Sequence, residues 1–412
     1  MSEKLRPFRN DLGLLGAIFL VAVITAVFSD SYQHQPGLVL QTLLRETAMV
    51  GIFALGAAVV IIAGGIDLSA GSVIAFSGTL FFGFIVLLAP DVDPSLPVER
   101  RTPDTDELAL WIPLVALGLT MFAGFLVGSL HAWLITVIRL PPFVATLASL
   151  VGLRSLARLL IQDMSAVRYH QRMSTIGVSD ELLTSVARER WWVPLIVWIV
   201  LCVLLWVLLS KTVWGRHLYA LGGNEEAARL SGIRTDRLKW LAYCIGSMTA
   251  SLAGILYACY VGTASPSTDG LGYELNAIAA AVVGGCSLTG GVGTVSGVIL
   301  GTLFLRLVID SVAKLFKSQP DLLEGLVVGM LVVLAVAFNE LRGEGLKKRF
   351  FPGALGWVNV FVLSGLAGIV TAVTSQEDKL KLGTIVGIST LFVLAAKAIT
   401  EMRTASRLSQ VG

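Results

Sequence analysis

Long stretches without a charged residue dominate the pattern of hydrophobic and polar positions. Eight of them contain at least 18 residues: 12–29, 47–66, 68–90, 108–138, 191–210, 240–268, 275–305 and 350–376. Three shorter ones cover 140–153, 325–339 and 382–396. A helix needs about 20 apolar residues to cross the hydrocarbon core of a bilayer. The pattern therefore predicts eleven or twelve membrane-spanning segments, some of them marginal in length.

These segments are expected to be helices, because lipid offers backbone amides no other partner and the alternating pattern of a membrane barrel is absent. Composition agrees: 55% of the residues are hydrophobic and the mean hydropathy is +0.80. Only 14% are charged, against about 25% in soluble domains. The sequence therefore predicts an all-α polytopic membrane protein, and the net charge of +3 is too small to suggest a nucleic-acid partner.

Loop charges predict the orientation, because positively charged loops stay in the cytoplasm. The N-terminus carries Lys4, Arg6 and Arg9 and is expected there, ahead of an uncleaved first helix. Segment 91–107, with six acids against two arginines, is expected outside together with 162–190. The basic segments return inside: 211–239, 342–349, and the tail with Arg403 and Arg407.

This alternation is consistent with ten helices up to Phe338 and two more near 353–374 and 382–399. We therefore expect a permease-like domain over 1–340 and a C-terminal extension over 341–412 with two further apolar segments. The polar stretches, at most about 30 residues long, are too short for a separate soluble core.

Catalytic and cofactor signatures are missing. No Gly-Lys pair occurs, so the chain has no P-loop for ATP. The four histidines are scattered, and no Gly-x-Ser-x-Gly sequence accompanies an intramembrane histidine. The four cysteines lie in apolar runs and are interpreted as small buried hydrophobes rather than metal ligands. We expect no enzyme activity, no metal and no cofactor in this chain.

The first informative motif is residues 64–72, Gly-Gly-Ile-Asp-Leu-Ser-Ala-Gly-Ser. Asp67 or Ser69 could cap the helix that follows, where a negative charge is favoured. A cap does not require the flanking glycines, among them Gly64 and Gly65. The motif therefore indicates a tight turn or unwound backbone between two spans.

The second motif is residues 214–233, in the most basic loop. Chain-breaking residues precede a short predicted helix over 225–231, which Gly232 ends. One side of this helix is alanine and the other is charged, which suits docking into a cleft of another protein. The candidate coupling residues are Gly222, Gly223, Asn224, Glu225, Glu226, Ala227, Ala228 and Gly232.

The third motif is residues 272–293, in which Glu274 precedes a predicted helix start. Five glycines within 284–293 make a continuous helix improbable there. Broken backbone inside a membrane is tolerated where it is buried in protein or lines a cavity. Candidate pore or gate residues of the first and third motifs are Gly64, Gly65, Asp67, Ser69, Glu274, Asn276, Gly284 and Gly285.

Ionisable residues within spans are costly and often functional. Glu46 with Arg45, and Arg306 with Asp310, are therefore further pore candidates. The alternative is that each pair merely neutralises itself locally, between sequence neighbours or across one helical turn.

Together with 140–147 (Leu-Pro-Pro-Phe-Val-Ala-Thr-Leu), the three motifs resemble permease subunits of bacterial ABC importers for monosaccharides, a group related to branched-chain amino acid permeases. The resemblance covers about residues 12–339. The chain departs from that pattern in its two added C-terminal segments and in a longer charged loop at 91–108.

The resemblance implies a plasma (inner) membrane protein of bacteria that works by alternating access. Its implied partners are a separate ABC ATPase subunit carrying the Mg-ATP, a second permease subunit forming a homodimer, an extracytoplasmic solute-binding protein and membrane lipid. The ATPase would contact segment 225–232. The expected cargo is a monosaccharide or related small polar solute.

Two other kinds of function remain open. One is ABC import of a branched-chain amino acid or a nucleoside. The other is a secondary transporter or channel that works alone, although the sequence shows no clear internal repeat and few acids near the middle of its spans. A membrane-embedded enzyme is disfavoured by the missing nucleophile and base pairs.

Overall fold

The computed structural model describes residues 6–315, 324–331, 333–334, 353–375 and 378–408. The chain divides into two compact units, one over 1–315 with 321–336 and the other over 316–320 with 337–412. Ten of the described helices are long and apolar enough to cross a membrane. The predicted all-α polytopic fold is confirmed. The predicted basic segment 342–349 and the end of the span predicted to reach Phe338 lie outside the described residues.

Eight of these long helices belong to the first unit: α1 (Arg6–Phe28), α3 (Pro36–Ile62), α4 (Ala70–Leu88), α5 (Trp111–Thr136), α6 (Pro142–Tyr169), α8 (Trp192–Lys211), α11 (Thr235–Val261) and α13 (Val295–Leu315). Its shorter elements are α2 (Asp30–His34), η2 (Val98–Arg100), α7 (Glu181–Arg188), α9 (Val213–Gly223), α10 (Glu225–Leu230), α12 (Tyr273–Val283), β1 (Ile176–Gly177) and β2 (Thr263–Ala264). Residues 324–331 are also helical.

Helices α3, α4 and α11 form the centre of the first unit. Every residue of α3 from Thr47 to Ile62 is buried, as expected of a helix that is apolar on all sides. Helix α1 instead exposes large side chains such as Phe19 and Phe28, which suits contact with lipid. Small residues allow the closest approaches: a Cβ at Gly128 of α5 would lie 2.6 Å from the Cys244 Cα of α11.

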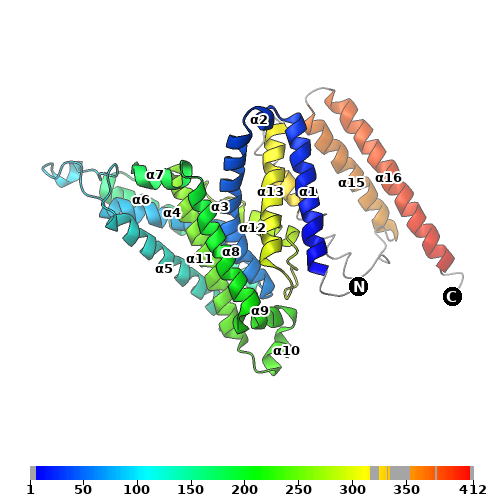
Figure 1. Cartoon of the computed structure of the whole chain (residues 1–412), viewed down its shortest axis with the longest axis horizontal. Coiled ribbons are helices and arrows are strands. Elements are labelled where there is room, and N and C mark those ends of the chain that lie inside the picture. The colour runs from blue at the N-terminus through cyan, green and yellow to red at the C-terminus, as the bar shows by residue number, and fades with distance from the viewer. Residues whose placement is uncertain (1–5, 316–323, 332, 335–352, 376–377, 409–412) are drawn as a thin grey trace. The chain divides into compact units, whose positions relative to one another are not determined.

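Short helices lie at the two ends of the first unit (Figure 1). One end carries α9 and α10. The opposite end carries α2, α7 and the antiparallel pair of β1 and β2, in which Ile176 faces Ala264. The loop after α4 joins this opposite end, because the Leu108 backbone N donates to Asp180 Oδ2 at 2.9 Å. The loops predicted to face one side of the membrane therefore share an end of the bundle.

The second unit is a pair of packed helices, α15 (Gly353–Thr374) and α16 (Lys379–Leu408). They meet at glycines: a Cβ at Gly368 would lie 3.3 Å from the Gly387 Cα. Both helices satisfy the length and hydropathy expected of membrane spans.

Candidate functional site

The break predicted at the first motif is present, because α3 ends at Ile62 and α4 begins at Ala70. Asp67 lies buried in this break. Its Oδ1 accepts hydrogen bonds from the Ser69 backbone N at 2.8 Å and from the Ser69 Oγ at 2.6 Å. Ser69 occupies the N-cap position, but its side chain makes no capping bond. Asp67 therefore satisfies the backbone at the start of α4, at the positive end of the helix dipole.

A second acid faces the same helix start. Glu274 lies in the first turn of α12, rather than before the helix as predicted, because α12 begins at Tyr273. A Cβ added at Gly71, in the first turn of α4, would collide with the Glu274 carboxylate. The structure therefore places Asp67 and Glu274 at one helix N-terminus, although they are about 200 residues apart.

Arg154 of α6 holds the unwound segment that leads into α12. Its buried Nη1 donates to the carbonyl oxygens of Pro266 and Asp269, both at 2.9 Å. It also interacts electrostatically with Glu274. An arginine within the long helix α6 thus replaces the hydrogen bonds that the unwound segment would make for itself as a helix.

A buried cluster of aromatic rings that the sequence motifs did not indicate lies beside Asp67. His131 of α5 is fully buried, and neither ring nitrogen has a hydrogen-bond partner in the described part of the chain. The Tyr243 ring lies edge-on to it at 6.2 Å between centroids, and the Tyr243 hydroxyl donates to the Ile66 carbonyl at 3.4 Å. Asp67 interacts electrostatically with both rings. The available signal was a histidine inside a long charge-free run.

Glycines from all three motifs meet at one junction. A Cβ at Gly290 would lie 2.8 Å from the Gly64 Cα and 2.7 Å from the Gly222 carbonyl oxygen. The Gly291 backbone N donates to the carbonyl oxygen of Ile62, the last residue of α3, at 2.9 Å. These distances leave no room for a side chain, so the loop carrying α9 is packed directly against both breaks.

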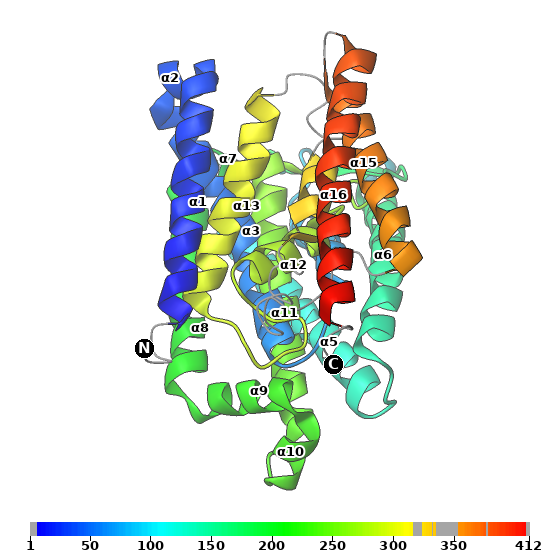
Figure 2. The same cartoon turned by 90° about the vertical axis from the view of Figure 1, so that its right-hand side faces the viewer.

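A tyrosine adds a second link between α9 and the loop after α12, which descends towards α9 (Figure 2). The Tyr219 hydroxyl donates to the Gly293 carbonyl at 2.8 Å. Burial raises the pKa of Tyr219, which keeps the hydroxyl a donor. Tyr219 was not predicted, because an aromatic residue in an amphipathic loop helix has no distinguishing sequence pattern.

The other predicted pore glycines, Gly65, Gly284 and Gly285, lie in different surroundings. A Cβ at Gly65 would lie 3.0 Å from Val60 Cγ1. Gly284 ends α12 and packs on α13, since a Cβ there would lie 2.6 Å from the carbonyl carbon of Gly297. Gly285 has a φ of +90° and open space around it. The predicted break after α12 is confirmed, because α13 begins only at Val295, but Gly284 and Gly285 do not belong to the junction.

The predicted short helix of the second motif is α10. The Asn224 side chain caps it by accepting from the Ala227 backbone N at 2.9 Å. Glu225 forms an ion pair with Lys239 at 2.6 Å, and Ala228 is buried. Gly232 follows the helix with a φ of +82°, which favours glycine.

The outer surface of the loop that contains α10 is exposed to solvent. Gly223, Glu226, Ala227 and Arg229 are exposed, and Leu230 is 85% exposed. An apolar side chain so exposed at this end of the bundle suits contact with another protein.

The local pairings considered as an alternative for the other ionisable candidates are not observed. Arg306 bonds Glu46 and approaches Glu324 at 4.0 Å, instead of pairing with Asp310. Asp310 pairs with Lys314 at 2.9 Å. Helix periodicity brings Asp310 within one turn of Arg306, but Arg306 points to α3 in the folded bundle.

Arg45 does not pair with Glu46 either. It donates to the Arg188 carbonyl oxygen at 3.1 Å and to the Tyr260 hydroxyl at 3.2 Å, and its guanidinium lies 4.5 Å from the centre of the Tyr260 ring. The two neighbours therefore point to different partners, because successive residues of a helix lie about 100° apart.

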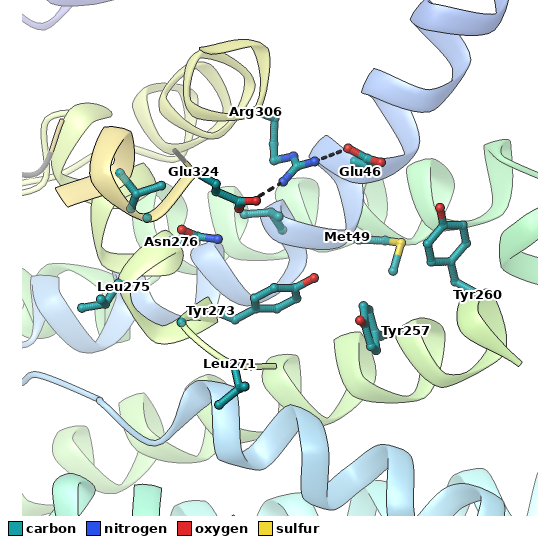
Figure 3. Close-up of a pocket in the computed structure, with 14 residues that line it drawn as sticks. Glu46, Met49, Tyr257, Tyr260, Leu271, Tyr273, Leu275, Asn276, Arg306 and Glu324 are labelled. Atoms are coloured by element: carbon teal, nitrogen blue, oxygen red, sulfur yellow. Dashed lines mark hydrogen bonds and ion pairs between the residues drawn. The ribbon is translucent and has the colours of Figure 1, made fainter. Parts of the chain in front are cut away.

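Glu46 and Arg306 border a cavity of about 420 Å³ (Figure 3). Residues of α3, α11, α12, α13 and helix 324–331 line it. Of the predicted pore residues, Asn276 lies in this lining and Glu274 does not. Three tyrosines of the lining, Tyr257, Tyr260 and Tyr273, had no assigned role at the sequence level.

Residues 39–336 match the family described as branched-chain amino acid transport system / permease component. The chain is 33% identical over 345 residues to the ribose import permease protein of Bacillus subtilis strain 168, covering 82% of this chain and 94% of that protein. It is 30% identical over 335 residues to the corresponding ribose protein of Escherichia coli K12, covering 80% and 93%. It is 31% identical over 340 residues to the autoinducer 2 import system permease protein of Photorhabdus luminescens, covering 82% and 92%. No solved structure matches the chain significantly.

Proposed function

Because the chain belongs to the family of branched-chain amino acid transport system permease components, we propose that it carries a monosaccharide or a related small polar solute across the membrane. It is a permease component of an ABC import system, and the ATPase is a separate subunit. The relatives whose names state a cargo, ribose and autoinducer 2, support this choice of solute class.

The junction of Gly64, Gly222 and Gly290 is the observation that carries the mechanism. The loop with α9 and α10 contacts both unwound segments through close-packed backbone atoms, and the Tyr219 hydroxyl adds a bond to the second of them. If a partner protein displaces α10, the segments packed against Gly222 must shift as well, because close-packed backbone atoms leave no free space between them. One of these segments leads into α4, and the other follows α12. Coupling of ATP hydrolysis to solute movement requires such a connection.

This mechanism assigns the partners and the orientation. The ATPase subunit docks on α10, so the end of the first unit with α9 and α10 and the N-terminus lie in the cytoplasm. An extracytoplasmic binding protein delivers solute at the opposite end, and a second copy of the chain completes the path in the plasma (inner) membrane. Residues 1–340 form the permease domain and 341–412 an appended pair of helices.

Within this domain, Asp67, Ser69, Glu274 and Asn276 serve as pore or gate groups, with Gly64, Gly65, Gly284 and Gly285 shaping the backbone around them. The two acids at the start of α4 support this assignment, because ionisable groups inside a membrane protein are costly and often mark the pathway of a solute or ion.

The test is purification of the full chain from its native membrane, followed by reconstitution into liposomes. We expect an ATPase subunit to co-purify, and ATP to drive uptake of labelled ribose, xylose or galactose once the binding protein is added. Leucine and uridine serve as competing cargo. ATP-dependent uptake of leucine or uridine alone would replace the solute class, and ATP-independent uptake by the chain alone would replace the transporter class.

A further inference from the structure

The cavity beside the Glu46–Arg306 pair lies among membrane-spanning helices. It is bounded by α3, α11, α12, α13 and helix 324–331. Its volume of about 420 Å³ falls within the range of about 300–1,000 Å³ that is usual for small-molecule sites. It is therefore large enough for one small solute with some water.

The walls combine aromatic faces with polar tips. The Tyr257 and Tyr273 rings stand nearly perpendicular, 5.8 Å apart at 83°. Tyr273 also stacks on Phe53 with ring centres 5.6 Å apart, which fixes its orientation. Figure 3 shows the Tyr257 and Tyr273 rings in the same lining as the Asn276 amide and the Arg306 guanidinium. Such walls can stack against the C–H face of a ring while they hydrogen-bond its hydroxyl groups.

One polar group of the lining lacks a partner. The Nε of Arg306 is buried and makes no hydrogen bond to the described residues. The rest of that guanidinium is held by Glu46 and Glu324. Because the Nε is shielded from the cavity, a solute hydroxyl can meet only other atoms of Arg306, which lines the cavity together with Asn276.

The charges of the lining exclude other cargo. Among its described residues, Arg306 is the only cation, and two carboxylates already neutralise it. A phosphate or a carboxylate entering the cavity would meet net negative charge without a free counter-ion. This argues against a sugar phosphate and against an amino acid with its carboxylate.

We propose that this cavity is a binding site for one uncharged, polyhydroxylated ring of monosaccharide size, occupied while the solute crosses the membrane. The proposal rests on the import function proposed above and names the chemistry of its cargo. Tyr257 and Tyr273 stack on the ring, while Asn276 and Arg306 bond its hydroxyls.

The test measures binding to the full chain in lipid nanodiscs, without ATPase or binding protein, by saturation-transfer NMR. The probes are ribose, xylose and galactose, with ribose 5-phosphate and leucine for comparison. We expect saturable binding of at least one of the three sugars and none of ribose 5-phosphate or of leucine, each of which carries an anionic group. Absence of saturable binding for all three sugars, or preferential binding of leucine, overturns the proposal.

Variants locate the bound sugar. Tyr257→Ala and Asn276→Ala should weaken binding at least about tenfold, since each removes a wall or a hydrogen bond. Tyr257→Phe, which keeps the ring, should retain more binding than Tyr257→Ala, and Tyr169→Ala, which lies outside the cavity lining, should bind like the unmodified chain. Unchanged binding in Tyr257→Ala overturns the location, and the behaviour of Tyr257→Phe shows that the site still folds.

Two readouts separate this proposal from the function. If the complex takes up sugar with ATP but the isolated chain binds none, the proposed function stands and the cavity is not a binding site. Binding by the isolated chain without ATP-driven uptake by the complex would do the reverse.

Discussion

Glu46 of α3 and Arg306 of α13 form an ion pair between residues 260 positions apart. Their side chains are only 28% and 15% exposed, and Glu324 stands on the other side of the guanidinium at 4.0 Å. The pair joins the central helix of the bundle to the helix that follows the second backbone break. It also replaces both local pairings that sequence spacing suggested.

The Glu46–Arg306 pair should appear as energetic coupling. We expect the double variant Glu46→Gln/Arg306→Gln to lose less stability than the sum of the single variants, with a coupling energy of about 1–3 kcal/mol. Thermal unfolding of the detergent-solubilised chain measures this. The matched cycle with Asp310→Asn should be additive, because Asp310 bonds Lys314 and Tyr32 instead. Coupling of Arg306 to Asp310 rather than to Glu46 would contradict the observed pairing.

Adjacent glycines in α9 should differ sharply. A Cβ at Gly222 would lie 2.5 Å from the Gly291 backbone N, whereas one at Gly223 meets nothing within 4 Å. Overpacking costs about 1–3 kcal/mol, so Gly222→Ala should shift the junction and lower ATP-driven uptake at least about tenfold. Gly223→Ala should transport normally. Equal uptake by both variants would show that the junction does not couple α9 to the breaks.

The capping role of Asp67 can be separated experimentally from the role of its charge. Asp67→Ala removes the acceptor of both Ser69 bonds and should reduce stability by about 1–2 kcal/mol, together with uptake. Asp67→Asn keeps an oxygen that can accept those bonds, so its thermal unfolding should stay close to that of the unmodified chain. Normal uptake in Asp67→Ala would make this carboxylate dispensable. Loss of uptake in a stable Asp67→Asn variant would assign the role to the charge beside His131 and Tyr243.

The exposed Leu230 should bind the ATPase. Leu230→Asp leaves the α10 cap and the Glu225–Lys239 pair untouched, so the chain should fold normally but retain at least about tenfold less ATPase during co-purification, as for a central interface contact. Leu182→Asp alters a 47% exposed leucine of α7, at the other end of the bundle, and serves as the control. Undiminished co-purification of the Leu230 variant would move the docking surface elsewhere.

Two further changes test the shape of the docking loop rather than its surface. Ala228 is buried and Gly232 has a φ of +82°. Ala228→Arg and Gly232→Asp should therefore distort α10 and its exit and abolish ATP-driven uptake. Uptake that survives both changes would exclude this loop from coupling.

Local sequence patterns were sufficient to predict most of the long apolar helices, the two backbone breaks and the short helix α10. Charge-free runs predict membrane helices because lipid forbids unpaired backbone. The glycines at 64–65 and 284–293 predict the ends of α3 and α12 because they allow backbone shapes that a helix does not. Asn224 and Gly232 predict the limits of α10 for the same local reasons.

Tertiary structure alone decided which of these features meet. The contacts of Gly64 with Gly222 and Gly290, of Glu274 with the start of α4, and of Arg306 with Glu46 join segments far apart in the chain. Helical periodicity tells which residues share a face of one helix, but in a membrane both lipid and protein interior are apolar. Which face packs on which neighbour therefore depends on side-chain shape and close approach across the whole bundle, and so do the cavity and the junction.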